Sequence, residues 1–329
     1  MHTETLMRAL ADSTRLRIMR LLSAMELAVG ELAQVLGQSQ PRVSRHVAIL
    51  CDAGLAERHR EGSWVFLRAR TNGDPIGEAV DRLLAIAERQ DGDFATRCGD
   101  DRRQLANIRD AREQSAAEYF ARHADDWDEL RALHSADDIV EARLIAALDG
   151  GVLGQMLDIG TGSGRMAEIF ANRADHIVAL DKSLDMLRVA RAKLQNLPAD
   201  AVELVQGDFA ALPFAAHRFD TVMLHQVLHF AQAPGAAMAE AARVTRPGGR
   251  IAIVDFAAHD REELRDRHAH ARLGFTDGAI ADLLRQAGFT LRETIACDEG
   301  ELTVKIWIGL REGGPAATDV KKTARRKSA

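Results

Sequence analysis

Cysteine is scarce in this chain, and it contains no long apolar runs. Its three cysteines, Cys51, Cys98 and Cys297, lie far apart and have no Cys-x-x-Cys spacing. This pattern argues against a disulfide framework and against a zinc site built on Cys-x-x-Cys. No apolar run is long enough to span a bilayer, and the N-terminus carries acids in place of a hydrophobic signal segment. We therefore expect a cytoplasmic protein that makes no use of a membrane.

The chain also lacks an overall excess of positive charge. It has 43 Lys and Arg against 49 Asp and Glu, a net charge of −6, which does not indicate nucleic-acid binding by the chain as a whole. Residues 38–70 reverse this sign locally, with six arginines against three acids. A small DNA-reading module joined to a larger acidic domain would show this pattern. The length of 329 residues also favours two domains over one.

Residues 155–165, QMLDIGTGSGR, predict a ligand-binding corner. A short apolar strand ends in Asp158, three glycines follow at alternate positions (Gly160, Gly162 and Gly164), and a helical pattern comes next. Glycine at a strand-to-helix turn lets the backbone approach a ligand closely, as in doubly wound α/β domains. The spacing D-x-G-x-G-x-G differs from the dinucleotide fingerprint G-x-G-x-x-G, which disfavours a pyrophosphate cradle. Taken alone, Asp158 also suits a helix N-cap or a strand-end acid, and the glycines also suit a plain tight turn.

Four downstream segments extend this pattern. Asp181 closes a second apolar run about 20 residues after the glycines, where an acid can accept both hydroxyls of a ribose. Residues 203–209, ELVQGDF, and 219–224, FDTVML, follow in order, and the turn 246–250, RPGGR, precedes the β-branched run 251–256. In this order the segments resemble class I S-adenosylmethionine (SAM)-dependent methyltransferases.

The resemblance implies a Rossmann-like domain over residues 151–312 that binds SAM or S-adenosylhomocysteine (SAH). It implies that Asp208 lies near the exocyclic amine of the adenine and Phe209 beside its ring. The implied cofactor-binding set is Asp158, Gly160, Gly162, Gly164, Asp181, Asp208, Phe209 and His225.

Two histidines, His225 and His229, follow the predicted fourth strand four residues apart. They are expected at the carboxyl edge of the sheet, where ligands bind and where an imidazole could face a methyl group. Neither has an evident acid partner in the sequence. A catalytic role for His225 or His229 is therefore left open.

The N-terminal residues predict a winged helix-turn-helix. Residues 4–25 form two helices broken near Asp12, and residues 29–36 form a short amphipathic helix. After the turn at 37–39, a helix from Gln40 buries Val43, Val47 and Leu50 and leaves its basic face outside. Two extended runs, 55–60 and 63–68, join at Glu61 and Gly62 as a hairpin wing.

The segment SQPRVSRH, with the helices before it, resembles the ArsR/SmtB family of bacterial repressors over about residues 1–90. The resemblance implies a homodimer on double-stranded operator DNA, with residues 75–90 as the dimerisation helix. The candidate DNA contacts are Gln40, Arg42, Ser44, Arg45 and His46 on the helix and Arg58 and Arg60 on the wing; a solvated helix face is the less favoured alternative, given the basic wing beside it. Arsenic sensors of the family carry two cysteines in the helix before the turn, but residues 26–32 contain none. We expect no metal site.

The remaining segments complete the expected map. Residues 91–150 are assigned as a linker and a helical lead-in or lid. The charge-rich residues 91–113 predict a linker entering a helix, with breaks at 91–93 and 99–101. Further on, Tyr119, His123 and Trp127 either line a site or pack on the sheet. Residues 313–329 are assigned as a disordered basic tail. The fold class is α/β, a winged helix-turn-helix domain followed by a Rossmann-like methyltransferase domain.

This fusion permits three functions. In the first, the protein is a transcriptional repressor whose operator affinity responds to SAM or SAH. In the second, it is an active methyltransferase on a small molecule, with a DNA-binding head that regulates its own gene. In the third, arsenite is both inducer and substrate. The third ranks lowest, because that chemistry needs converging thiols and the three cysteines are scattered.

Overall fold

The computed structural model describes residues 3–61, 64–70, 74–128, 136–149, 151–198 and 200–313. The predicted basic tail lies outside these residues, apart from Gly313. The chain divides into two compact units. Unit 1 comprises Met1–Arg122, His229–Ala233 and Ala258–Gly274, and unit 2 comprises His123–Leu228, Pro234–Ala257 and Phe275–Ala329.

Unit 1 contains the predicted helix-turn-helix. Its first helices are α1 (Thr3–Leu10), α2 (Ser13–Ala24), α3 (Val29–Leu36), α4 (Gln40–Asp52) and α5 (Pro75–Gln90). The predicted break between α1 and α2 is present, because the Asp12 carboxylate caps α2 by accepting the backbone N–H of Arg15 at 3.1 Å. Gly37 ends α3 with a φ of 62°, a left-handed conformation that glycine adopts at little cost.

A three-stranded antiparallel sheet completes the winged fold. It consists of β1 (Leu27–Ala28), β2 (Ala56–Glu61) and β3 (Trp64–Ala69) in the order β1-β3-β2. Strand β3 pairs with both neighbours, so it joins the outer wing strand β2 to the helical core. The hairpin predicted from the sequence is therefore present, although its turn residue Gly62 lies outside the described residues.

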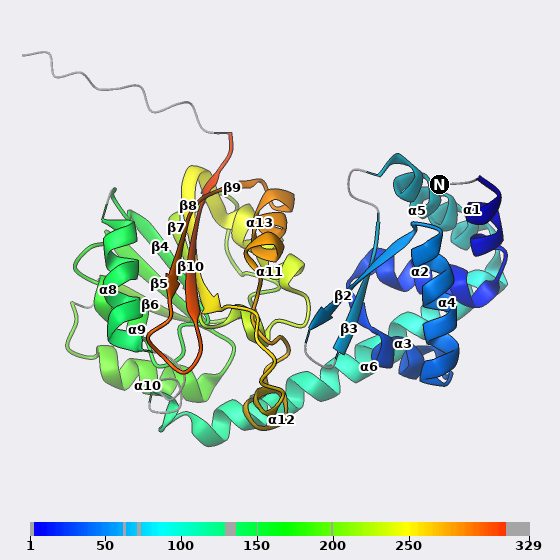
Figure 1. Cartoon of the computed structure of the whole chain (residues 1–329). Helices are drawn as coiled ribbons and strands as arrows, with labels where there is room; N and C mark the ends of the chain where they lie inside the picture. The colour runs from blue at the N-terminus through cyan, green and yellow to red at the C-terminus, as the bar shows by residue number, and fades with distance from the viewer. Residues whose placement is uncertain are drawn as a thin grey trace, which may run out of the picture. The chain divides into compact units, whose positions relative to one another are not determined.

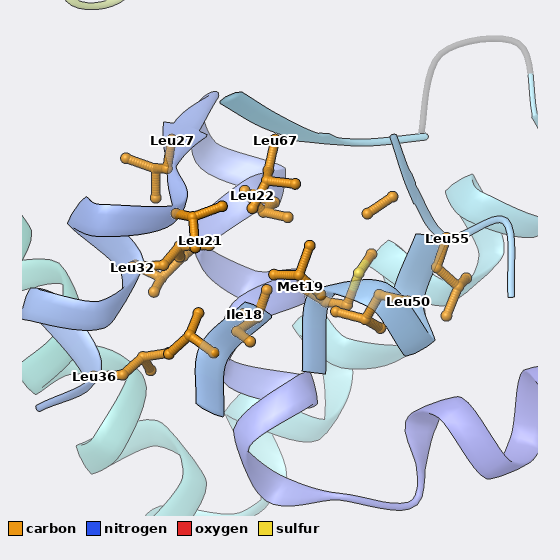
Figure 2. Close-up of a cluster of buried hydrophobic side chains, with 14 of the residues drawn as sticks. Ile18, Met19, Leu21, Leu22, Leu27, Leu32, Leu36, Leu50, Leu55 and Leu67 are labelled. Atoms are coloured by element: carbon orange, nitrogen blue, oxygen red, sulfur yellow. The ribbon is translucent and has the colours of Figure 1, made fainter. Parts of the chain in front are cut away.

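The core of unit 1 draws side chains from every helix of the helix-turn-helix and from the sheet (Figure 2). Ile18 and Met19 of α2, Leu32 of α3, Leu50 of α4 and Leu67 of β3 are fully buried. Each such side chain contributes about 1.5–3 kcal/mol on burial. This packing fixes the orientation of α4, because Val43, Val47 and Leu50 face the core as their spacing predicted.

Helix α6 (Gly92–His123) corrects one expectation. The charge-rich residues 91–113 predicted a linker with breaks at Gly92 and Gly99, but the structure has one continuous helix of 32 residues. Asp101, which looked like a breaker, is 2% exposed and accepts a hydrogen bond from Arg17 Nε at 2.7 Å. This ion pair to α2 and the packing of Leu105 in the core of unit 1 join α6 to the winged-helix fold, although its local composition is unfavourable for a continuous helix. The 258–274 segment of unit 1 contains the short helix α12 (Glu263–His268).

Unit 2 is built on a seven-stranded sheet (Figure 1). Its strands are β4 (Gln155–Ile159), β5 (His176–Asp181), β6 (Val202–Gln206), β7 (Phe219–His225), β8 (Thr245–Phe256), β9 (Phe289–Cys297) and β10 (Val304–Arg311). The order is β6-β5-β4-β7-β8-β10-β9, with β4 to β8 parallel and the closing pair antiparallel. The strand order reverses between β4 and β7, and ligands bind at such a switch point.

Helices cover both faces of this sheet (Figure 1). On one face lie α8 (Asp137–Leu148), α9 (Arg165–Phe170) and α10 (Leu184–Leu194); on the other lie α11 (Pro234–Val244) and α13 (Asp277–Gln286). The residues RPGGR, expected as a turn, are assigned to the beginning of β8, where the pairing with β7 shifts its register. Within the described ranges, no helix is both long and apolar enough to cross a bilayer.

Candidate functional site

The three glycines form a turn at the end of β4. Their φ angles are 69° at Gly160, 55° at Gly162 and 85° at Gly164, all in the left-handed region. The backbone N–H groups of Gly160 and Thr161 donate to the Leu180 carbonyl at 2.8 and 2.9 Å, which ties the turn to β5. A Cβ on Gly160 would lie 2.3 Å from Cγ2 of Val227, so no side chain fits there. The turn therefore requires glycine for both conformation and space.

Gly160→Ala is expected to lower the free energy of unfolding by about 2 kcal/mol or more, from backbone strain and overpacking together. Urea titration would measure the loss. Gly235→Ala is the control, because a Cβ at Gly235 in α11 has no heavy atom within 4 Å and helical alanine should be neutral or favourable. Equal stability of Gly160→Ala and wild type would contradict the described turn.

Two predicted acids hold this turn in shape. Asp158 is 1% exposed, and its Oδ2 accepts the Thr161 hydroxyl at 2.6 Å. Asp181 accepts the backbone N–H of Gly162 at 2.9 Å on Oδ2 and that of Ser183 at 2.8 Å on Oδ1. Burial raises the pKa of the Asp181 carboxyl, while the N–H groups of Ser183 and Gly162 act in the opposite direction. A carboxylate can accept about four hydrogen bonds, so Asp181 retains acceptor capacity for a ligand.

Asp208 and Phe209 follow β6 and are both partly buried. Asp208 Oδ1 accepts the backbone N–H of Ala210 at 2.8 Å, and its Oδ2 lies 2.9 Å from Lys182 Nζ. Because Lys182 directly follows Asp181, this ion pair links the residues beyond β5 to those beyond β6. The acids predicted from separate segments thus lie at neighbouring strand ends of one sheet edge.

The residues after α6 contribute to the turn in a way that the sequence left open. Trp127 was assigned either to a site or to packing, and a Cβ built on Gly162 would lie 3.3 Å from its Nε1. Asp128, which the sequence analysis missed, accepts the Ser163 hydroxyl on Oδ1 at 2.6 Å. Lys193 of α10 also pairs with Asp128. Trp127 therefore lies against the glycine turn, and Asp128 anchors that arrangement.

The two histidines fall in different units. His225 is the last residue of β7 in unit 2 and is 8% exposed. His229 lies in the 3₁₀ turn η1 (Leu228–Phe230) and belongs to unit 1, where its ring centroid is 4.2 Å from that of His270. Strand β7 thus places His225 at the sheet edge expected for the site, whereas His229 packs within an aromatic cluster.

The helix α4 presents most of its predicted DNA contacts to solvent. Gln40, Arg42, Ser44 and Arg45 are exposed, opposite the buried Val43, Val47 and Leu50. His46 differs, because its side chain is 13% exposed and its Nδ1 lies 3.6 Å from Asp12 Oδ1. In this position, His46 is better placed to orient α4 against Asp12, the N-cap of α2, than to reach a base.

The wing adds exposed cations beside this helix. Arg58 and Arg60 occupy alternate positions of β2 and are both exposed. Arg58, Gln40 and Ser44 line a common hollow of about 410 Å³, together with α3 and Val65 of β3. A concave surface lined by Arg58 can follow a phosphate backbone while helix side chains reach base edges.

No group of three or more His, Cys, Asp or Glu side chains within the described ranges is arranged to hold a metal ion.

Comparison with known proteins assigns a family model to each unit. The model described as "Bacterial regulatory protein, arsR family" matches residues 12–58, and the model described as "Methyltransferase domain" matches residues 157–253. The first covers α2 to the middle of β2, and the second runs from β4 into β8. Both models coincide with the folds described above.

Two similar proteins are named as methyltransferases. A demethylmenaquinone methyltransferase of Renibacterium salmoninarum is 37% identical over 116 residues, which are 35% of this chain and 47% of that protein. A malonyl-[acyl-carrier protein] O-methyltransferase of Salmonella typhimurium is 32% identical over 180 residues, 52% of this chain and 68% of that protein. The chain thus spans about half to two thirds of the length of these relatives.

A solved structure shares the fold. A chain of the complex between the Haloferax volcanii Trm112 methyltransferase activator and its methyltransferase superposes with a TM-score of 0.50 at 20% identity, covering 59% of this chain and 98% of that one. At this identity the likeness concerns architecture.

Proposed function

Since the chain belongs to the class I methyltransferase family and carries a DNA-binding domain of the bacterial arsR family, we propose that it is a transcriptional repressor whose operator affinity depends on the nucleoside bound to unit 2. The cofactor is SAM or SAH, as predicted from the sequence and as the methyltransferase match indicates. The regulator acts in the cytoplasm, where bacterial operators lie.

One observation carries the DNA-binding part of the proposal. The hollow lined by Gln40, Ser44 and Arg58 places the exposed face of α4 and the cationic wing side by side. A protein that reads DNA needs this combination, since phosphate contacts fix its register and base contacts specify sequence. The exposed Arg42 and Arg45 are assigned to bases, and Arg58 and Arg60 to phosphates.

The nucleoside part rests on the edge of the sheet in unit 2. Asp181 would accept the ribose hydroxyls, Asp208 the exocyclic amine of the adenine, and Phe209 would lie beside the ring. Gly160, Gly162 and Gly164 allow the backbone to approach the amino-acid portion of the ligand, with Asp158 and Thr161 holding the turn. SAM and SAH differ by one methyl group and one positive charge, so a state that prefers one of them shifts with the ratio of the two.

The test is fluorescence anisotropy of a labelled duplex from upstream of the protein's own gene, at fixed salt. The full chain is titrated onto this duplex in the presence of SAM, of SAH or of neither. We expect one of the two to change DNA affinity by about fivefold or more relative to the other. If both bind to the protein and DNA affinity is unchanged, the sensor proposal fails.

The regulator is proposed to act as a homodimer. Helix α5 carries Ile76, Leu83 and Ile86 on one stripe, with exposed fractions of 39%, 57% and 50%. Large apolar side chains at this spacing suit the face of another helix. The family resemblance assigns this helix to dimerisation, and a second copy of the chain is the proposed occupant.

Leu83→Glu is expected to convert the dimer to a monomer at micromolar concentration. A two-fold axis brings two such glutamates together, so the dissociation constant should rise by about 100-fold or more. Light scattering coupled to gel filtration measures the mass. Leu184→Glu, at a 63% exposed position of α10, is the matched control and should leave the mass unchanged. A monomeric wild type, or an unaltered Leu83→Glu dimer, would contradict this interface.

A second candidate function is methyl transfer to a small molecule. The names of the relatives favour it, and His225 is a buried imidazole at the edge of the sheet that could accept a proton. Incubation with SAM labelled in its methyl group and a small-molecule cell fraction would test it. Label transfer that is lost in His225→Ala supports the enzyme, and SAM recovered intact rejects it for that fraction.

A further inference from the structure

Residues Ala258–Gly274, here called the strap, belong to unit 1 although they lie between two elements of unit 2 in the chain. The strap leaves the end of β8 at Phe256 and returns to α13 at Asp277. Its packing is therefore with the winged-helix unit, while both of its ends continue into the methyltransferase fold.

Arg272 fixes the strap to the base of the wing. The arginine is 3% exposed, and its Nη2 lies 3.0 Å from Glu26 Oε2, just before β1. Its guanidinium carbon lies 4.0 Å from the ring centroid of Phe66, a buried residue of β3. A desolvated guanidinium over an aromatic face combines cation–π attraction with a charge-assisted hydrogen bond. Arg272 thus contacts β3, one of the two strands of the wing.

The strap is joined to the segment that follows β7. The backbone N–H groups of Ala271 and Arg272 donate to the His229 carbonyl at 3.0 and 2.9 Å. The Tyr119 hydroxyl of α6 lies 2.9 Å from Nδ1 of His268 within the strap. His229 is four residues beyond His225, the last residue of β7. Two loops that begin at the ends of β7 and β8 are therefore hydrogen-bonded to each other, and Arg272 connects them to Phe66 of the wing.

We propose that Arg272 is a positioning residue through which the strap sets the placement of the wing in response to the nucleoside site; this inference rests on the proposed function. Phe66 of β3 pairs with His59 of β2, between the positions of Arg58 and Arg60. A displacement of Arg272 would therefore move the strand that carries the phosphate-binding cations. The strap continues from β8 and is hydrogen-bonded to the loop after β7, so a ligand that favours one arrangement of the ends of these two strands biases the wing.

The variant designed for the test is the double substitution E26Q/R272M. Removing Arg272 alone would leave a carboxylate facing a site from which its cation had gone, a change that can unfold a protein. The double variant removes both charges and keeps an apolar stem over Phe66. The control is Arg267→Met, which removes an exposed cation from the same strap. Arg272→Lys restores the charge without the planar group.

Three quantities are measured on the full chain. They are the SAH affinity by calorimetry, the DNA affinity by anisotropy with and without saturating SAH, and the hydrogen exchange of β2 and β3 with and without SAH. In wild type and Arg267→Met, we expect SAH to change DNA affinity by about fivefold or more. In E26Q/R272M the ratio of the DNA affinities with and without SAH should fall to near one, while SAH affinity stays within about twofold of wild type. Arg272→Lys should give an intermediate ratio. A merely structural role would lower DNA affinity without altering the SAH-dependent ratio.

Failure of this inference is distinguishable from failure of the proposed function. If the double variant keeps the wild-type ratio, the strap proposal is overturned while the sensor remains. If the DNA affinity of wild type is the same with and without SAH, the sensor proposal fails, and hydrogen exchange decides on the strap. SAH-dependent exchange in β3 of wild type that is lost in E26Q/R272M supports the strap, and SAH-independent exchange in wild type overturns it.

Discussion

Asp181→Ala is expected to weaken SAM and SAH binding by at least about 100-fold. The proposed ribose contacts are two hydrogen bonds to a charged acceptor, each contributing about 1.5–3 kcal/mol, and both are lost in the variant. The turn also loosens, because the backbone N–H groups of Gly162 and Ser183 lose their acceptor. Calorimetry measures the affinity, and thermal unfolding checks that the fold persists. Asp185→Ala removes an exposed acid from the first turn of α10 and should bind as wild type does. Wild-type affinity in Asp181→Ala would refute the site.

The same carboxyl predicts a pH signature. Burial raises the pKa of Asp181 above its ordinary value of 3.8, and the ionised form is the better ribose acceptor. Affinity should therefore begin to fall at a higher pH than for an ordinary aspartate, and Asp208→Asn should keep the same inflection. For the unliganded fold the sign is opposite: the stability that this group contributes is present below its unfolded-state pKa and is lost as pH rises through the raised one. Affinity that begins to fall only in the pH range of an ordinary aspartate would contradict the assignment.

Arg45→Ala is expected to weaken binding to the upstream duplex by about 1–3 kcal/mol, roughly 5- to 150-fold, if it forms a bidentate pair with guanine. Its exposed position on α4 leaves the fold and the SAH affinity unchanged. Anisotropy on the upstream duplex and on a scrambled duplex separates base contacts from phosphate contacts. Arg285→Ala, an exposed arginine of α13, is the control. Equal losses on both duplexes would assign Arg45 to a phosphate.

The parallel sheet and the winged helix were predictable because each depends on local signals. Apolar runs ended by Asp158 and Asp181 indicate strands, and the spacing of Val43, Val47 and Leu50 determines which face of α4 is buried. Helix α6 was not predictable in the same way. Its glycines and acids argue for a break, but tertiary contacts, among them the packing of Leu105 in the core and the pair between Arg17 and Asp101, outweigh local propensity.

The candidate site was predictable where a single segment carries its pattern. The positions of Asp181 and Asp208 follow from the ends of consecutive parallel strands. The contact of Trp127 with Gly162, the anchor from Asp128 to Ser163 and the inward position of His46 depend on which distant segments meet in space. A single sequence does not show which distant segments come into contact. For the same reason, nothing around Arg272 indicated that it contacts Phe66.

The interleaving of the two units bears on how this protein can be divided. The chain passes between them five times, so no single cut separates a complete DNA-binding half from a complete methyltransferase half. A fragment ending at Arg122 would lack the strap and expose the ring of Phe66. Such a fragment would not be a self-contained domain, because part of its packing partner is missing. Domain exchange with a simpler repressor would therefore have to transplant residues 229–233 and 258–274 along with the head.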